Sequence, residues 1–408
     1  MNLLVELVVC DLVPLRERGS YTAIVFSSAV IGSALGPWIG GEVTERSSWR
    51  WVFYINLPIG GVALVMLVLL LNVGHRDLTT KEKLRRVDLV GNIIFVGAVL
   101  ALMFALIYGG VIYPWGSWHV VVPLVLGAVG LLLFALFEAS PYCMEPSMPR
   151  QLFGNRTSVA ALVLSFIHSS MMTWVLYFLS VYFQAVRVKS PATTGVNLLP
   201  TVLGFTPAAV VAGVLLAKFG RYRPYHLAGF AILVVGIGLF SLLSPTTPTA
   251  GFVLLQILFA IGCGIIMPSL LPAMQAELSD LDIATATATL SFARSFGNIL
   301  GSVVPSIIFN NQFDHYADHI NNSTVTAELV GGQAYSHATS NFINSLSSPT
   351  RDEVIWTCNE ALKLVWYVGI AFCAAGLLTA FVEKEIRLRT ALETEFGMTE
   401  TEKNASAA

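Results

Sequence analysis

Two ionisable residues, His168 and Arg294, lie deep inside long apolar stretches of the sequence. Imidazole titrates near physiological pH, so His168 could relay protons or could serve as a neutral, hydrogen-bonded packing residue, which is the favoured interpretation. A guanidinium at such depth in a membrane costs from about 3 to over 10 kcal/mol unless it is paired or faces water. If the threonine-rich stretch 284–289 lies at the membrane interface, Arg294 simply extends toward that interface. We favour a functional or gating role for Arg294.

Several polar residues among the apolar ones could line a central cavity. An amide can hydrogen-bond a small molecule, and it can equally well bridge two neighbouring helices. Each residue therefore keeps both interpretations. The residues are Gln184, Asn197, Gln256, Gln275 and Asn298.

The acidic residues offer no obvious membrane-embedded proton carrier. Every Asp and Glu between residues 20 and 383 lies at a predicted helix end or in a loop, and we expect Glu138 to reach the membrane interface. His315 and His319, together with Asp314 and Asp318, have the spacing of metal ligands on a helix, but a solvated outer loop is the favoured interpretation. We expect no metal, no cofactor and no enzymatic active site.

The composition indicates a polytopic, all-α membrane protein. Of 408 residues, 55% are hydrophobic and 12% are charged, with a mean hydropathy of +0.72, whereas soluble domains have roughly 25% charged residues. The net charge of −2 argues against nucleic-acid binding. The five cysteines have no CxxC spacing, so neither a zinc site nor a disulfide framework is predicted.

Charge-free runs predict ten full transmembrane helices. Residues 2–13 are too short to cross roughly 30 Å of hydrocarbon, and they resemble the end of a further span. Two long runs are divided at the turn-forming segments 113–118 and 244–249. The predicted spans are 20–41, 51–73, 89–111, 119–137, 159–183, 191–217, 225–244, 250–274, 284–309 and 364–382.

The distribution of Lys and Arg predicts the orientation. Alternate loops on one side, together with the C-terminal tail, carry 16 of these residues, and the opposite loops carry 6. The positive-inside rule therefore places the C-terminus in the cytoplasm and residues 310–363 outside. That outer segment contains overlapping glycosylation sequons at Asn321 and Asn322, which is consistent with the same orientation.

A glycine-rich stretch interrupts the first predicted span. Its glycines lie on helix faces that permit close backbone approach, and its proline removes one helical hydrogen bond. Such a segment is tolerated where neighbouring helices support it. The residues are Gly32, Gly36, Pro37, Gly40 and Gly41.

The Gly32–Gly36 spacing recurs at Gly297 and Gly301, 265 residues later. Each pair follows a short acidic loop and a helix start rich in small residues. This recurrence supports an internal repeat, as in transporters whose two halves rock about a central site.

The spacing GxxxGPxxGG resembles the antiporter motif of the major facilitator superfamily. The stretch from Trp49 to Gly61 is similar to the signature that follows this helix in fourteen-span drug:proton antiporters. Segments 182–200 and 275–297 resemble the second half of the same family, and the long outer loop is similar to that of fungal members. Segment 213–221 resembles the cytoplasmic-loop motif, with Ala217 in place of its usual Asp.

This resemblance implies a domain organisation. Residues 1–73 would be the remnant of an N-terminal helix half, since the family has three to four further helices before them. Residues 74–158 would contain two linker helices with flanking cytoplasmic loops. The C-terminal six-helix half would span 159–383, including an outer loop at about 310–363, and 384–408 would form a cytoplasmic tail.

The resemblance implies an efflux transporter that exchanges small organic molecules, such as drugs, toxins or secondary metabolites, for protons. We expect a monomer in the plasma membrane, with the vacuolar membrane as an alternative. An uptake or vacuolar permease for siderophores or basic amino acids, and a non-functional truncated transporter, stay open. A polytopic membrane enzyme would need a catalytic cluster near one membrane face, which the sequence does not offer.

Overall fold

The computed structural model describes residues 8–9, 13–18, 20–25, 32, 36, 39–40, 43, 47–48, 50–70, 88–110, 112–140, 143, 148, 150–278 and 282–388. Within these ranges the regular structure is helical, and nine helices are long and apolar enough to cross a membrane. The all-α polytopic prediction is confirmed. Nine of the ten predicted spans have a counterpart, and the remaining one, 20–41, lies largely outside the described residues.

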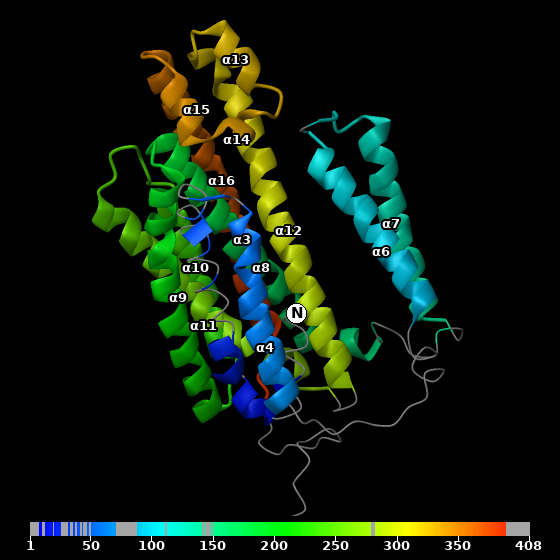
Figure 1. Cartoon of the computed structure of the whole chain (residues 1–408). Coiled ribbons are helices and arrows are strands. Elements are labelled where there is room, and N and C mark those ends of the chain that lie inside the picture. The colour runs from blue at the N-terminus through cyan, green and yellow to red at the C-terminus, as the bar shows by residue number, and fades with distance from the viewer. Residues whose placement is uncertain are drawn as a thin grey trace, which may run out of the picture.

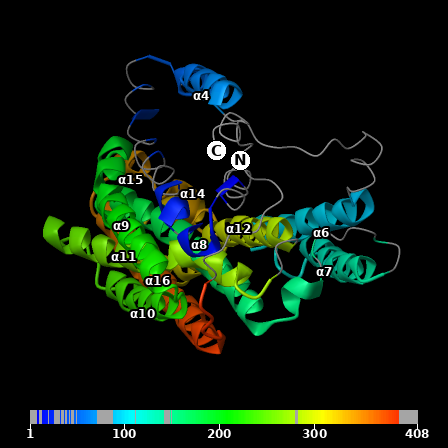
Figure 2. The same ribbon diagram turned by 90° about the horizontal axis from the view of Figure 1, so that it is seen from below.

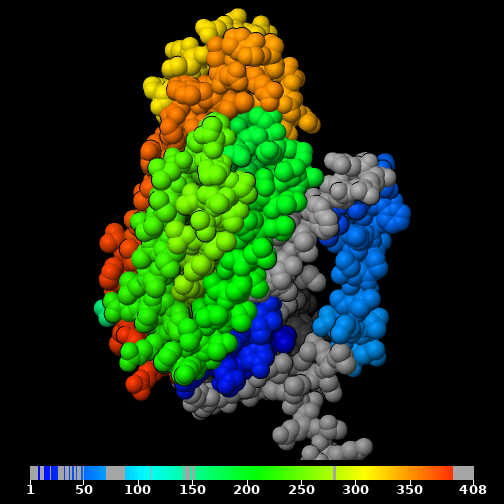
Figure 3. Space-filling model, turned by 90° about the vertical axis from the view of Figure 1, so that its left-hand side faces the viewer, coloured from blue at the N-terminus to red at the C-terminus, as the bar shows by residue number. Residues whose placement is uncertain are grey.

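The first membrane-length helix stands apart from the others. Helix α3 spans Trp51–Tyr54, and α4 continues over Asn56–Leu70. Every described side chain from Trp51 to Leu69 is exposed. Figures 2 and 3 both show α4 separated from the main bundle. Its apolar surface is therefore available to lipid or to another helix.

Helices α6 (Leu89–Tyr108) and α7 (Trp118–Glu138) form an antiparallel hairpin. Asp88 begins α6, and its side chain accepts a hydrogen bond from the backbone N–H of Gly91 at 2.8 Å. Phe95 joins the two helices through Phe134, with ring centroids 4.8 Å apart, and touches Phe292 of the main bundle at 4.7 Å. The hairpin thus lies beside α12 (Figure 1).

Six long helices form the main bundle. Side-chain caps at Asn155 and Ser190 begin the first two of them, and Gly220, with φ of 65°, ends the second. Short helices flank the first, namely η1 (Arg150–Phe153) and the π-helical η2 (Tyr182–Val186). The six are α8 (Arg156–Val181), α9 (Pro191–Phe219), α10 (Arg223–Phe240), α11 (Thr249–Gln275), α12 (Ile283–Tyr316) and α16 (Thr350–Val382).

Aromatic side chains fill the centre of this bundle. Trp174, Phe178 and Trp366 are fully buried, and Trp366 lies 5.2 Å from the Phe240 ring. Large buried rings contribute strongly to stability through their area and specific contacts. They fix α8, α10 and α16 around a common core.

The predicted outer loop is a folded cap of short helices. Figure 1 shows these short helices covering one end of the bundle. They are η4 (Ala317–His319), α13 (Ser323–Leu329), α14 (Ala334–His337) and α15 (Ser340–Ser345). Helix α16 begins at Thr350, about four turns before the predicted start at residue 364. The prediction stopped at charged residues, but a helix can continue beyond the hydrocarbon into this cap.

Candidate functional site

A polar pair joins α8 and α12 on the surface of the bundle. Thr173 donates a hydrogen bond from Oγ1 to Oδ1 of Asn298 at 3.0 Å. Asn298 is exposed, and Thr173 is half-buried. Arg294, also half-buried, lies one turn before Asn298 on α12. We call Thr173, Asn298 and Arg294, which supply a hydroxyl, an amide and a guanidinium, the α8–α12 polar strip.

Aromatic rings lie on the other flank of the α8–α12 contact, because residues two apart on a helix do not share a face. Phe292 and Phe296 flank Arg294 in the sequence and stack with centroids 5.9 Å apart. Phe296 also lies 5.9 Å from Phe166 of α8. These rings pack toward Phe95 of α6 and Phe166 of α8, whereas a molecule at the strip would meet its few hydrogen-bonding groups.

Glycines set the position of α12 against α8. A Cβ added at Gly297 would lie 2.4 Å from the carbonyl oxygen of Phe166, and one at Gly301 would lie 2.2 Å from that of Ser170. Ser170 Oγ donates to the Gly297 carbonyl at 2.9 Å. The backbones therefore touch at Gly297 and Gly301, and this contact orients the polar strip.

His168 lies inside the bundle, away from that surface. It is 5% exposed, and its Nε2 lies 3.0 Å from the carbonyl oxygen of Cys263 in α11. A carbonyl can only accept, so Nε2 carries a proton and donates. This contact favours the packing interpretation of His168 over a proton relay.

Gln256 bridges α11 and α9. Its Oε1 accepts from Thr201 Oγ1 at 3.0 Å, and its Nε2 donates to the Asn197 carbonyl at 3.0 Å. Gln256 is fully buried, so it serves as a helix–helix contact. Asn197 and Gln184 are half-buried on separate elements, and the structure does not bring either of them to the α8–α12 polar strip.

Gln275 links three parts of the chain. Its Nε2 donates to Thr287 Oγ1 at 2.9 Å, and its Oε1 accepts from the buried guanidinium of Arg18 at 2.7 Å. Arg16, two residues earlier, donates to the carbonyls of Ala217 and Lys218. The sequence analysis missed both arginines as contact residues. The sequence did contain a sign of this role. The two arginines come directly before the predicted span 20–41, and Gln275 directly follows the predicted span 250–274.

Comparison with known proteins identifies the family. Residues 3–91 and 83–302 match the model described as Major Facilitator Superfamily. The chain belongs to the major facilitator superfamily. It is therefore an integral membrane transporter, which confirms the membrane protein predicted from composition and the transporter predicted from the motif resemblance.

Named fungal facilitators resemble the chain along nearly its whole length. It is 47% identical over 405 residues to the "MFS efflux transporter aclA" of Aspergillus oryzae, covering 99% of this chain and 73% of that protein. It is 46% identical over 403 residues to the "MFS-type transporter gkaD" of Penicillium citrinum, covering 98% and 69%. It is 44% identical over 403 residues to the "Efflux pump FUS6" of Gibberella moniliformis, covering 98% and 72%.

The first glycine motif of this facilitator is only partly described. A Cβ built at Gly32, Gly36 or Gly40 would meet nothing within 4 Å among the described residues. Pro37 and Gly41 lie outside the described residues. Close packing at this motif remains a prediction, whereas its repeat at Gly297 and Gly301 does form a tight contact.

A buried histidine–carboxylate pair, which the sequence analysis did not identify, links α10 to the residue after α16. His226 Nδ1 lies 2.8 Å from Glu383 Oε2, and both side chains are fully buried. Tyr222 donates to the Lys384 carbonyl, and the backbone N–H of Leu388 donates to Gly220 at 3.1 Å. Burial, followed by the Glu383 charge, raises the pKa of Tyr222. These contacts hold residues 383–388 against the segment 220–226, where α9 ends and α10 begins.

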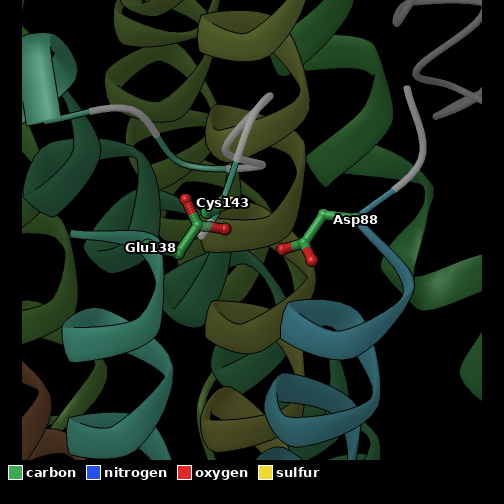
Figure 4. A group of neighbouring side chains, drawn as sticks. All are labelled: Asp88, Glu138 and Cys143. Carbon is green, nitrogen blue, oxygen red and sulfur yellow. The ribbon is translucent and has the colours of Figure 1, made fainter. Parts of the chain in front are cut away.

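Three potential metal ligands meet at the end of the α6–α7 hairpin. Figure 4 shows Asp88 and Glu138 facing one another, with Cys143 beside Glu138. One ligand atom from each lies within 4.8 Å of the others. Burial, Asp88 and Glu138 all raise the pKa of the Cys143 thiol, so it resists forming the thiolate that a metal prefers. We assign no metal to this group.

The two sequon asparagines already have partners in the outer cap. The Asn321 side chain donates to Glu353, and Asn322 Oδ1 accepts from the backbone N–H groups of Thr324 and Val325 at 3.1 and 3.3 Å. Both residues are exposed. An enzyme could reach them, although Asn322 would give up its cap on α13.

Proposed function

We propose that the chain exports small, largely apolar organic molecules in exchange for protons, and that the α8–α12 polar strip contacts them. The observation that carries this proposal is the exposed Thr173–Asn298 pair next to Arg294 on otherwise apolar helices. Polar groups on a membrane helix are costly to expose to lipid. A water-filled cavity between two moving halves would remove that cost.

Several observations support export of apolar compounds. The aclA and FUS6 proteins carry the words "efflux transporter" and "efflux pump" in their names. One hydroxyl and one amide can orient a substrate, and the helices around them are otherwise largely apolar.

Arg294 is the residue we assign to gating. It is half-buried on α12, one helical turn before Asn298. Segment 275–297, which contains Arg294, resembles the second half of drug:proton antiporters, and this resemblance supports a use in transport. Alternation of Arg294 between two environments would couple the strip to the two states of the transporter.

The finer assignments follow from the same resemblance. We infer a fourteen-span antiporter, monomeric and glycosylated at the outer cap, in the plasma membrane of a fungal cell. The α6–α7 hairpin fits the two linker helices of such a protein, and α8–α16 fits its C-terminal half. The N-terminal half would then include α3 and α4.

The test is export of rhodamine 6G from cells that produce the full chain. Thr173→Val and Asn298→Leu should each lower export while leaving the amount of protein unchanged. Thr379→Val is the matched control, because this half-buried hydroxyl of α16 bonds only to the Ala375 carbonyl of its own helix, at 2.8 Å. If all three variants export equally, the polar strip does not contact substrate.

Arg294→Gln separates a functional role from a structural one. A gating arginine predicts that the variant loses export but keeps or gains thermal stability. A structural arginine predicts loss of stability together with export. Proton coupling predicts that a protonophore abolishes export by the wild type, and export that survives a collapsed pH gradient contradicts it.

A further inference from the structure

A long groove opens on the face of the bundle formed by α9, α10 and α11. Helices α9 and α10 both pack extensively on α11, but not on each other. The floor of the groove is a row of isoleucines at four-residue spacing, Ile257, Ile261 and Ile265. The groove encloses about 660 Å³, within the roughly 300–1,000 Å³ range of small-molecule sites. Figure 3 looks onto this green face.

Close helix contacts hold the groove in shape. A Cβ added at Gly204 of α9 would lie 2.9 Å from the Ala260 Cβ of α11. One added at Gly229 of α10 would lie 2.3 Å from Ile266 Cγ1. Helices α9 and α10, which form the walls, therefore both pack closely on α11, which forms the floor. The space between them persists because small side chains, Ala208 and Ala228 among them, line it.

The length of the groove matches one leaflet of a bilayer. The α9 wall runs from Leu203 through Val211 to Leu215, and all three side chains are exposed. These residues span about 18 Å along the helix, close to half of the ~30 Å hydrocarbon thickness. An apolar groove of this length, parallel to the helices, fits an acyl chain of one leaflet.

Unpaired cations gather at one end of the groove. Lys218 follows Leu215 by three residues on the same face of α9, and it is exposed. Arg16 reaches the same end by donating to the Ala217 and Lys218 carbonyls. Arg223, by contrast, donates to the Phe381 carbonyl of α16 at 2.9 Å and so lies on the other face of α10.

The nearby carboxylates have other partners. Glu385 pairs with Arg221 at 3.2 Å, and Glu277 pairs with Lys384 at 3.4 Å. Within the described part of the chain, Arg16 and Lys218 form no ion pair with a carboxylate. The positive-inside asymmetry assigns this end to the cytoplasm, where anionic lipids are concentrated.

We propose that this groove binds one anionic phospholipid of the cytoplasmic leaflet. An acyl chain occupies the space between α9 and α10, and the net negative headgroup, with its phosphate and carboxylate, lies on Arg16 and Lys218. The site is on the outer surface of the bundle and does not depend on the transport activity proposed above. It gives the protein a preference for one class of lipid.

Native mass spectrometry of the purified full chain tests the proposal. Phosphatidylserine and phosphatidylcholine with identical acyl chains are titrated separately. Each interfacial cation contributes about fivefold in affinity. We expect phosphatidylserine to bind at least fivefold more tightly. Lys218→Gln should weaken phosphatidylserine binding about fivefold and should weaken phosphatidylcholine binding much less, because the choline ammonium offsets the phosphate charge. Lys189→Gln, an exposed lysine at the opposite membrane end, should have no effect.

A second pair of variants tests the groove itself. Ala228→Phe fills the groove from the α10 wall and should weaken phosphatidylserine binding by tenfold or more. Ala371→Phe adds the same ring at an exposed position on α16 and should not. Equal binding of the two lipids, no difference between these two variants, or displacement of phosphatidylserine by a neutral sterol would each overturn the proposal.

Discussion

Replacing Gly301 with alanine places a methyl group where α8 and α12 are in backbone contact. The new Cβ would lie 2.2, 2.8 and 2.9 Å from the O, Cα and C atoms of Ser170. These are backbone atoms, so a helix must move by about 1 Å to restore normal contact. Overpacking of this kind costs about 1–3 kcal/mol. The higher helix propensity of alanine offsets at most about 1 kcal/mol of this loss of stability.

Gly238→Ala is the matched control. The nearest atom to its added Cβ is Ile370 Cδ1 at 3.6 Å, an ordinary van der Waals contact. This variant should therefore be neutral or more stable by up to about 1 kcal/mol. The two variants should differ by about 1–3 kcal/mol, with Gly301→Ala the less stable.

The assay is the fraction of detergent-purified protein that remains monodisperse after heating over a temperature series. Gly301→Ala should lose its monodisperse peak at a lower temperature than wild type, and Gly238→Ala should not. Equal heat resistance of the two variants would refute the close α8–α12 contact as a determinant of stability.

Three further predictions follow from local contacts. Gln275→Leu removes an acceptor from a buried guanidinium, and should cost about 1.5–3 kcal/mol of stability in the same heating assay. Cys143 has a raised pKa, so its thiol stays protonated to higher pH than an ordinary cysteine and should react slowly with maleimide at pH 8; Asp88→Asn lowers that pKa and should speed the reaction. A glycosidase should increase the gel mobility of wild type but not of an Asn321→Gln/Asn322→Gln variant.

Each of these has a clear contrary result. Unchanged heat resistance of Gln275→Leu would show that its hydrogen bonds are replaced by water. Asp352→Asn, a change far from the hairpin, is the control for the thiol, and an equal rate in Asp88→Asn and this control would contradict the electrostatic cause. A tag placed after Gly332 that is accessible only from the cytoplasmic side would contradict the predicted orientation of the outer cap.

The sequence alone was sufficient to predict the membrane-spanning helices and the family resemblance. Hydrophobic length is a local property, because a span needs about 20 apolar residues in a row wherever it lies in the fold. The glycine and proline spacings are equally local, so they can be compared with a family motif without coordinates. Charge was less reliable at helix ends, since α16 begins at Thr350 and carries charged residues in its first turns.

Only the tertiary structure decided which residues meet. Gly32–Gly36 and Gly297–Gly301 have the same spacing in the sequence, yet in the described chain only the second pair touches a neighbouring backbone. Gln256 and Asn298 are both amides in apolar helices, but one is buried between helices and the other is exposed. Such differences depend on the direction of each helix face and on its neighbours, which come from distant parts of the chain.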